Sequence, residues 1–212
     1  MAYAIVVVGT SWGGLSAVRE LVRALPRSFT LPLVVVQHRH PDSDHLLSTL
    51  LQDSTPLPVS EVEDKTPILP GGVYLAPADY HLLVEDGHFS LSMDEPVQYS
   101  RPSIDVAFAS VADVYGRRAA GVVLTGANAD GARGLWRIVD RGGLGFVQTP
   151  ATAESPAMPT AAMNAVPEAR VATIAEIGAA LGMLPMHRID SAVAARATRS
   201  GDARGDRAPD AR

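Results

Sequence analysis

The sequence contains no cysteine, which excludes a disulfide framework and any thiolate metal site. Its only lysine is Lys65, so no glycine loop ends in the Lys-Ser or Lys-Thr pair of a Walker phosphate-binding motif. No apolar run approaches the length that crosses a membrane, and the first residues carry no basic segment of a secretory signal. These absences predict a soluble, cytoplasmic protein without membrane insertion.

The chain also has no excess of positive charge. Its formal net charge is −5 and its pI is near 5.6, so we expect no nucleic-acid partner. Residues 188–212 differ from the rest, because they hold six arginines and four aspartates but almost no large apolar side chain. Such a segment cannot bury enough surface to offset the entropy of ordering. The sequence therefore predicts one folded domain over residues 1–187 and a disordered tail over 188–212.

Within that domain, short apolar runs alternate with stretches of helical periodicity. Continuous apolar strands that alternate with helices are typical of a doubly wound α/β fold, in which helices cover both faces of a mainly parallel sheet. The pair Asp86-Gly87 predicts an antiparallel hairpin added to it. Strands are expected at 4–8, 33–37, 59–62, 74–76, 81–85, 88–92, 121–124 and 144–148, and helices at 15–25, 46–52, 104–115, 132–141 and 174–184.

The turn after the first expected strand places Ser11 between glycines, directly before a helix. Glycine-flanked turns of this kind expose a nucleophilic serine, and the free N–H groups of the helix start can bind an oxyanion. A dinucleotide fingerprint needs a second glycine where Ser11 stands. The remaining alternative is an ordinary strand–helix turn in which the serine occurs by chance.

Two further polar residues follow expected strands: His38 after 33–37, and Asp130 in the loop after 121–124. Carboxyl ends of parallel strands meet at one edge of the sheet, so Ser11, His38 and Asp130 would lie together there. A serine, an imidazole and a carboxylate are the groups that acyl transfer needs. Taken singly, His38 could be an ordinary loop histidine, and Asp130 could cap the helix that begins near Gly131.

The segment around His38 leaves a metal-dependent hydrolase open. His38, His40, Asp42 and His45 nearly reproduce the spacing of a binuclear metal cluster, although His45 stands two places late. A polar loop that leads into a helix explains the same residues without a metal. A third hypothesis is a non-catalytic module that docks on a signalling complex.

Several blocks, in the same order, resemble the catalytic domain of CheB-type chemotaxis protein-glutamate methylesterases. The resemblance covers about residues 4–184. The blocks are Gly9–Gly14, Val36–His38, Leu69–Pro77, Arg101–Val106, Leu124–Ala132, and Gln148 followed by Met158-Pro159.

This resemblance implies a serine esterase that hydrolyses glutamate γ-methyl esters and can deamidate glutamines, with a methylated receptor helix as substrate and no cofactor or metal. The family's triad carries over to Ser11, His38 and Asp130, and its oxyanion-hole amides to Trp12 and Ala127. The family usually has threonine and methionine at those last two positions, which bears on substrate choice. Because the first strand begins at the very start of the sequence, we expect no receiver domain. Activity would then be constitutive, with any regulation supplied by a separate protein.

Overall fold

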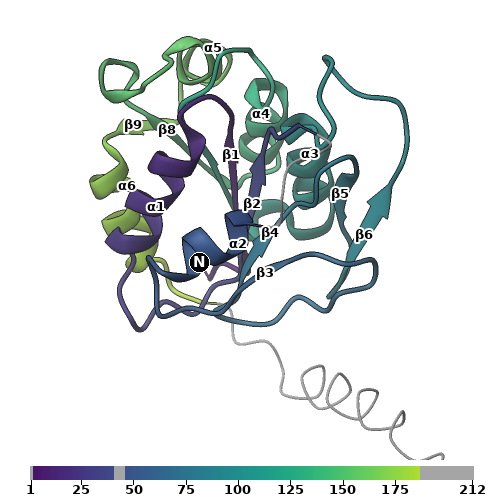
Figure 1. Ribbon diagram of the computed structural model, residues 1–212. Coiled ribbons are helices and arrows are strands. Elements are labelled where there is room, and N and C mark those ends of the chain that lie inside the picture. Colours follow the sequence, from purple (N-terminus) through teal and green to yellow (C-terminus); the bar gives the residue numbers. More distant parts are fainter. Residues whose placement is uncertain (1, 41–45, 187–212) are drawn as a thin grey trace, which may run out of the picture.

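The computed structural model describes residues 2–40 and 46–186. In this part of the chain, seven strands form one sheet in which every pairing is parallel (Figure 1). Their order across the sheet is β3-β4-β2-β1-β7-β8-β9. The strands are β1 (Ile5–Thr10), β2 (Leu33–Gln37), β3 (Val59–Glu61), β4 (Val73–Leu75), β7 (Ala119–Val123), β8 (Leu144–Gln148) and β9 (Arg170–Ala172).

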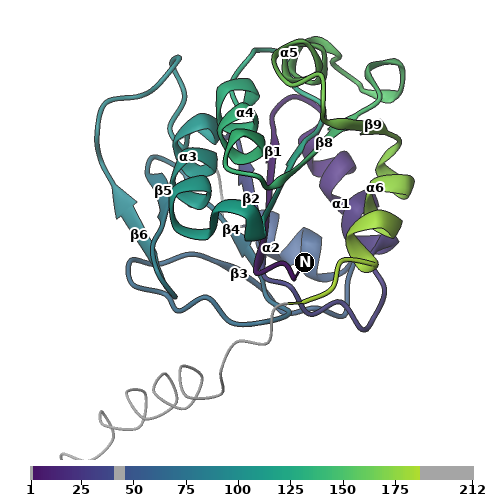
Figure 2. The same ribbon diagram turned by 180° about the vertical axis from the view of Figure 1, so that it is seen from behind.

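Helices cover both faces of this sheet, as Figures 1 and 2 show from opposite sides. Side chains alternate along a strand, so Val6 and Val8 of β1 face one core, whereas Ile5 and Val7 face the other. The first core is closed by α1 (Gly14–Ala24), α2 (Leu46–Gln52) and α6 (Ile174–Gly182), and the second by α3 (Ile104–Tyr115), α4 (Ala132–Asp140) and α5 (Ala157–Ala165).

The expected hairpin is a separate two-stranded antiparallel sheet of β5 (His81–Val84) and β6 (Phe89–Ser92). Its turn holds Gly87 at φ +81°, a backbone conformation that glycine adopts without strain. Leu82 and Phe89 are fully buried in the same core as α3. The predicted fold class is therefore confirmed, with the hairpin packed beside the main sheet.

Among the α-helices and strands of the described residues, two were not expected: α5 and the edge strand β9. Helix α5 carries Pro159 in its first turn and buries only Met158, Pro159 and Ala162, so its sequence has a weak helical pattern. Residues 188–212, the predicted tail, lie outside the described residues. Within residues 2–40 and 46–186, no helix is both long enough and apolar enough to cross a membrane.

Candidate active site

Ser11 lies on the turn that joins β1 to α1, at the carboxyl edge of the sheet. Its backbone N–H donates to the carbonyl of Thr125 at 2.9 Å, and its carbonyl accepts from Gly14 N–H at 2.9 Å. Gly13, the N-cap of α1, has φ +76°, where a residue with a Cβ atom would be strained. The Ser11 turn is thus held on one side by the helix and on the other by the loop after β7.

Thr125 joins that loop to the Ser11 turn through a buried polar network. Its hydroxyl donates to the carbonyl of Trp12 at 2.9 Å and accepts from Ser155 N–H at 2.8 Å. Its carbonyl accepts from the Thr10 hydroxyl, and its N–H donates to the Gln148 side chain, both at 2.8 Å. Buried polar groups that are fully paired fix geometry, so the two loops form one unit.

His38 follows β2 and contacts Asp130 directly. The Nε2 atom of His38 lies 2.8 Å from Oδ2 of Asp130, whose side chain is fully buried. The other ring nitrogen, Nδ1, faces the Ser100 hydroxyl at 3.4 Å and the Asn128 amide nitrogen at 3.5 Å. A carboxylate partner fixes the proton on Nε2, which leaves the lone pair on Nδ1.

Asp130 accepts hydrogen bonds from the start of α3 as well as from His38. The donors are the N–H groups of Ile104 at 2.7 Å and Asp105 at 2.9 Å, and the Ser103 hydroxyl at 3.1 Å. Burial by itself would raise the pKa of Asp130, but the hydrogen bonds from His38 and from these backbone groups outweigh it and hold the pKa below its ordinary value. Asp130 is therefore ionised at neutral pH.

The alternative in which Asp130 caps the helix after it is wrong. The N-cap of α4 is Gly131, at φ +97°, and the N–H groups of Gly131 and Gly134 at that end donate to the side chain of Asp105, not to Asp130. Asp130 instead occupies the N-terminus of α3, where free N–H groups and the positive end of the helix dipole stabilise a carboxylate.

Ser11 and His38 line one cavity of about 330 Å³, together with Trp12 and Gln37. Among the described residues, no hydrogen bond joins the Ser11 hydroxyl to His38. Catalytic hydrogen bonds are often unformed without substrate and tighten only in the complex. A Cβ atom on Gly126 would lie 3.0 Å from Cβ of Ser11, so that glycine gives the serine room.

Of the two residues expected to supply the oxyanion-hole amides, Trp12 lines this cavity, and Ala127 directly follows Gly126, which lies next to Ser11. Within the described residues, neither the N–H of Trp12 nor that of Ala127 donates a hydrogen bond. Both residues are exposed, with the Trp12 side chain 66% accessible. Unpaired backbone amides near a nucleophile are what stabilisation of a tetrahedral oxyanion requires.

A second cavity, of about 390 Å³, is also lined by His38, together with Ser100, Tyr99 and Arg101. No role was predicted from the sequence for Ser100, Asn128 or Ser103. Only Ser103 had a local signal: a serine directly before a helical pattern is typical of an N-cap, and Ser103 is the N-cap of α3.

The residues of the alternative metal cluster are only partly described, since Asp42 and His45 lie outside the described ranges. Within residues 2–40 and 46–186, no group of three or more histidines and carboxylates is placed to hold a metal ion.

A parallel α/β fold with a serine turn, an imidazole and a buried carboxylate at its carboxyl edge is typical of α/β hydrolytic enzymes. The chain belongs to the CheB methylesterase family, whose model matches residues 6–181. The enzyme class expected from the sequence is thereby confirmed.

Individual relatives agree with this membership. A Leptospira interrogans protein named "Putative protein-glutamate methylesterase/protein-glutamine glutaminase" is 45% identical over 78% of this chain and 86% of its own length. A protein-glutamate methylesterase/protein-glutamine glutaminase of Carboxydothermus hydrogenoformans is 36% identical over 90% of this chain, which spans 54% of that relative. The crystal structure of the Thermotoga maritima CheB methylesterase catalytic domain superposes with a TM-score of 0.82 at 30% identity, covering 87% of this chain and all of that one.

Proposed function

We propose that this chain hydrolyses glutamate γ-methyl esters, and deamidates glutamines, on chemoreceptor-type proteins by means of Ser11, His38 and Asp130. The observation that carries the proposal is the 2.8 Å contact between His38 Nε2 and the buried Asp130 carboxylate, at the edge of the sheet where Ser11 lies on a glycine turn. The names of the relatives supply the substrate class.

In the first half-reaction, the Ser11 hydroxyl attacks the ester carbonyl while Nδ1 of His38 takes its proton. Asp130 accepts the Nε2–H hydrogen bond and stabilises the imidazolium that forms. The negative charge that develops on the carbonyl oxygen is bound by the N–H groups of Trp12 and Ala127.

Collapse of that intermediate completes the transfer. His38 returns the proton from Nδ1 to the departing methoxide, so methanol leaves and a glutamyl ester of Ser11 remains. A water molecule, deprotonated by the same nitrogen, then hydrolyses the acyl-enzyme and restores Ser11. With a glutamine substrate the same steps release ammonia, because the acyl-enzyme is identical.

The surface around the site suits a protein substrate. Trp12, beside the serine, is 66% exposed, and Tyr99, beside His38, is completely exposed. Large exposed aromatic side chains are enriched where proteins bind one another. Both cavities at His38 are open, which leaves room for an ester on a helix surface.

The test is to incubate the full chain with receptor carrying labelled methyl groups and to measure volatile methanol. The wild type should release label, Ser11→Ala should release none, and a chelator should leave the rate unchanged. Loss of activity with the chelator would favour the metal-dependent alternative. Absence of methanol release while a small ester is still hydrolysed would contradict the substrate class but not the serine chemistry.

A further inference from the structure

Two buried carboxylates, Asp105 and Asp130, lie at the starts of α3 and α4. The Asp130 carboxylate accepts hydrogen bonds from the start of α3, and the Asp105 carboxylate accepts them from the start of α4. Asp130, which precedes the N-cap of α4, accepts the first two N–H groups of α3, from Ile104 at 2.7 Å and Asp105 at 2.9 Å. Asp105, in the first turn of α3, accepts N–H groups of α4 from Gly131 at 2.9 Å and Gly134 at 2.7 Å. The arrangement is reciprocal, so neither helix start can shift without moving the carboxylate that the other one holds.

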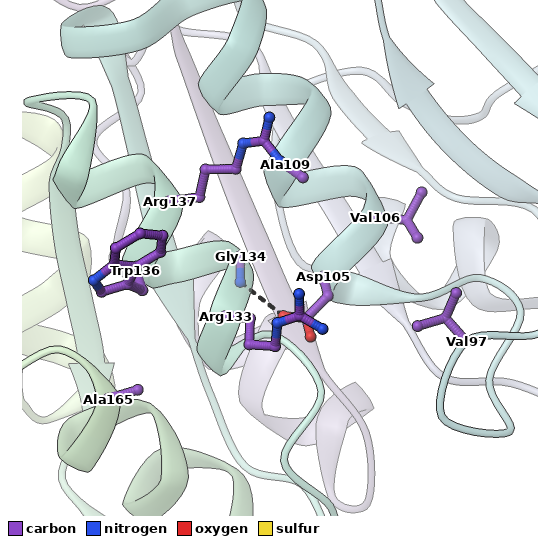
Figure 3. A pocket seen from close by; sticks show the side chains of 9 residues that line it. All are labelled: Val97, Asp105, Val106, Ala109, Arg133, Gly134, Trp136, Arg137 and Ala165. Atoms are coloured by element: carbon purple, nitrogen blue, oxygen red, sulfur yellow. Dashed lines mark hydrogen bonds between the residues drawn. The ribbon is translucent and has the colours of Figure 1, made fainter.

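Figure 3 shows the Asp105 carboxylate between α3 and α4, with the bond from Gly134 drawn and Arg133 beside it. It lies at a cavity of about 500 Å³ that is also lined by Val106 and Trp136. Burial raises the pKa of Asp105, and the negative charge of Asp130 adds to this effect. Packing alone does not explain a second carboxylate so close to Asp130, because apolar side chains would join the two helices without the cost of burying a charge.

Asp105 is also connected, through Gln98, to the loop that faces the Nδ1 atom of His38. Its second oxygen, Oδ2, accepts from the Gln98 amide at 3.1 Å. Gln98 lies in a tight loop closed by two backbone hydrogen bonds between Val97 and Ser100, of 3.1 and 2.9 Å. Ser100 in turn faces Nδ1 of His38 at 3.4 Å. One carboxylate therefore connects to the groups that face both nitrogens of His38.

We propose that Asp105 is a positioning residue of the active site, which holds Asp130 on the Nε2 side of His38 and the Ser100 loop on the Nδ1 side. It touches neither substrate nor His38 and acts through these two connections. The proposal rests on the function proposed above, because positioning matters only if His38 is the base. Misplacement of a catalytic group by about 1 Å can cost on the order of 10²-fold in rate.

The test compares Asp105→Ala with Asp105→Asn in the full chain, using a small ester such as p-nitrophenyl acetate. Asp105→Ala should lower kcat by roughly 10- to 100-fold with little change in KM. Asp105→Asn should recover most of that loss, because an amide oxygen still accepts both glycine N–H groups.

Asp113→Ala is the matched control. Asp113 also joins α3 to α4, through Arg137 at 2.8 Å and Arg141 at 3.2 Å, but on the exposed surface. That variant should leave kcat unchanged. An unchanged kcat in folded Asp105→Ala, or an Asn variant that is as impaired as the Ala variant, would overturn the proposal. Where Asp105→Ala does not fold, Gln98→Ala decides: a lower kcat supports the role of Asp105, and an unchanged kcat refutes it.

An NMR measurement, which needs no enzymatic turnover, tests the role of Asp105 independently of the proposed function. The Nε2 proton of His38, bonded to a buried carboxylate, should give a protected NMR resonance in the wild type. The resonance should be exchange-broadened or lost in folded Asp105→Ala and retained in Asp113→Ala. If the wild type hydrolyses no ester, the proposed function is wrong. The resonance of the Nε2 proton still shows in that case whether Asp105 positions Asp130.

Discussion

His38 presents Nε2, and not Nδ1, to the carboxylate of Asp130, at 2.8 Å. In the chymotrypsin arrangement the aspartate takes Nδ1 and the serine faces Nε2. Here the lone pair that would deprotonate Ser11 is on Nδ1, the nitrogen closer to the histidine backbone. In the proposed mechanism the three groups keep the roles that they have in chymotrypsin, but the two nitrogens of the imidazole exchange their partners. Such a site is therefore recognised by which groups contact one another, and not by which imidazole nitrogen makes each contact.

Replacement of Ser11 by alanine should abolish esterase activity. Without the nucleophile no acyl-enzyme forms, and we expect kcat to fall by at least about 10⁴-fold. Labelling by a serine-directed phosphonate should disappear, while the thermal unfolding temperature stays close to that of the wild type. Ser16→Ala is the control, since Ser16 lines the same cavity on α1 and should be dispensable. If Ser100→Ala, and not Ser11→Ala, removed the labelling, the nucleophile would be misassigned.

Replacement of Asp130 by asparagine should keep the fold but impair the base. An amide at this position can donate to Nε2 and so favour the wrong imidazole tautomer, with an expected loss in kcat on the order of 10⁴. Steady-state kinetics on a small ester measures this loss. Undiminished turnover in Asp130→Asn would show that the carboxylate only caps α3.

Most of the fold could be predicted from periodicity alone. The bounds of β2, α2, α3 and β8 match the expected ranges to the residue. Each is a compact run with clear apolar patterning, next to polar, glycine or proline residues at its ends. Strand β9 was not predicted because two of its three residues are exposed, so its sequence lacks the apolar run of a buried strand.

The site was predictable only in part, for a physical reason. Ser11, His38 and Asp130 follow strands of a parallel sheet, and that topology alone gathers them at one edge. The contact between Asp130 and the start of α3 joins residues about 25 positions apart and depends on how α3 packs against α4. No local pattern encodes that packing, and none indicates which nitrogen of His38 the carboxylate meets.

Replacement of Trp12 by threonine should separate chemistry from recognition. If only the backbone N–H of Trp12 binds the oxyanion, kcat on a small ester should stay within about tenfold of the wild type, a cost of about 1.4 kcal/mol. KM for a receptor substrate should rise more, because a side chain that is 66% exposed is lost. Trp136→Thr, which removes an exposed indole from α4, is the control. A collapse of kcat on the small ester would mean that the indole holds the catalytic backbone in place.

The two buried carboxylates should affect stability in opposite directions. The pKa of Asp130 is lowered from 3.8, so folding favours its charged form; its contribution is complete at neutral pH and is lost only as the pH falls through the lowered value. The pKa of Asp105 is raised from 3.8, so its contribution is lost as the pH rises through the raised value, and its charge costs stability at neutral pH.

Thermal unfolding at pH 7 should therefore show Asp130→Asn below the wild type and Asp105→Asn above it. The gain from Asp105→Asn should shrink as the pH falls through the raised pKa of Asp105 toward 3.8, because the folded-state carboxyl is then protonated and no longer buries a charge. The loss from Asp130→Asn should persist to a lower pH, because that carboxylate stays charged in the folded state below 3.8. A variant that is more stable but slower would fit a buried charge retained for activity, since active sites commonly trade stability for function. Destabilisation of both variants at pH 7 would show instead that the hydrogen bonds of Asp105 to α4 outweigh the cost of burying its charge.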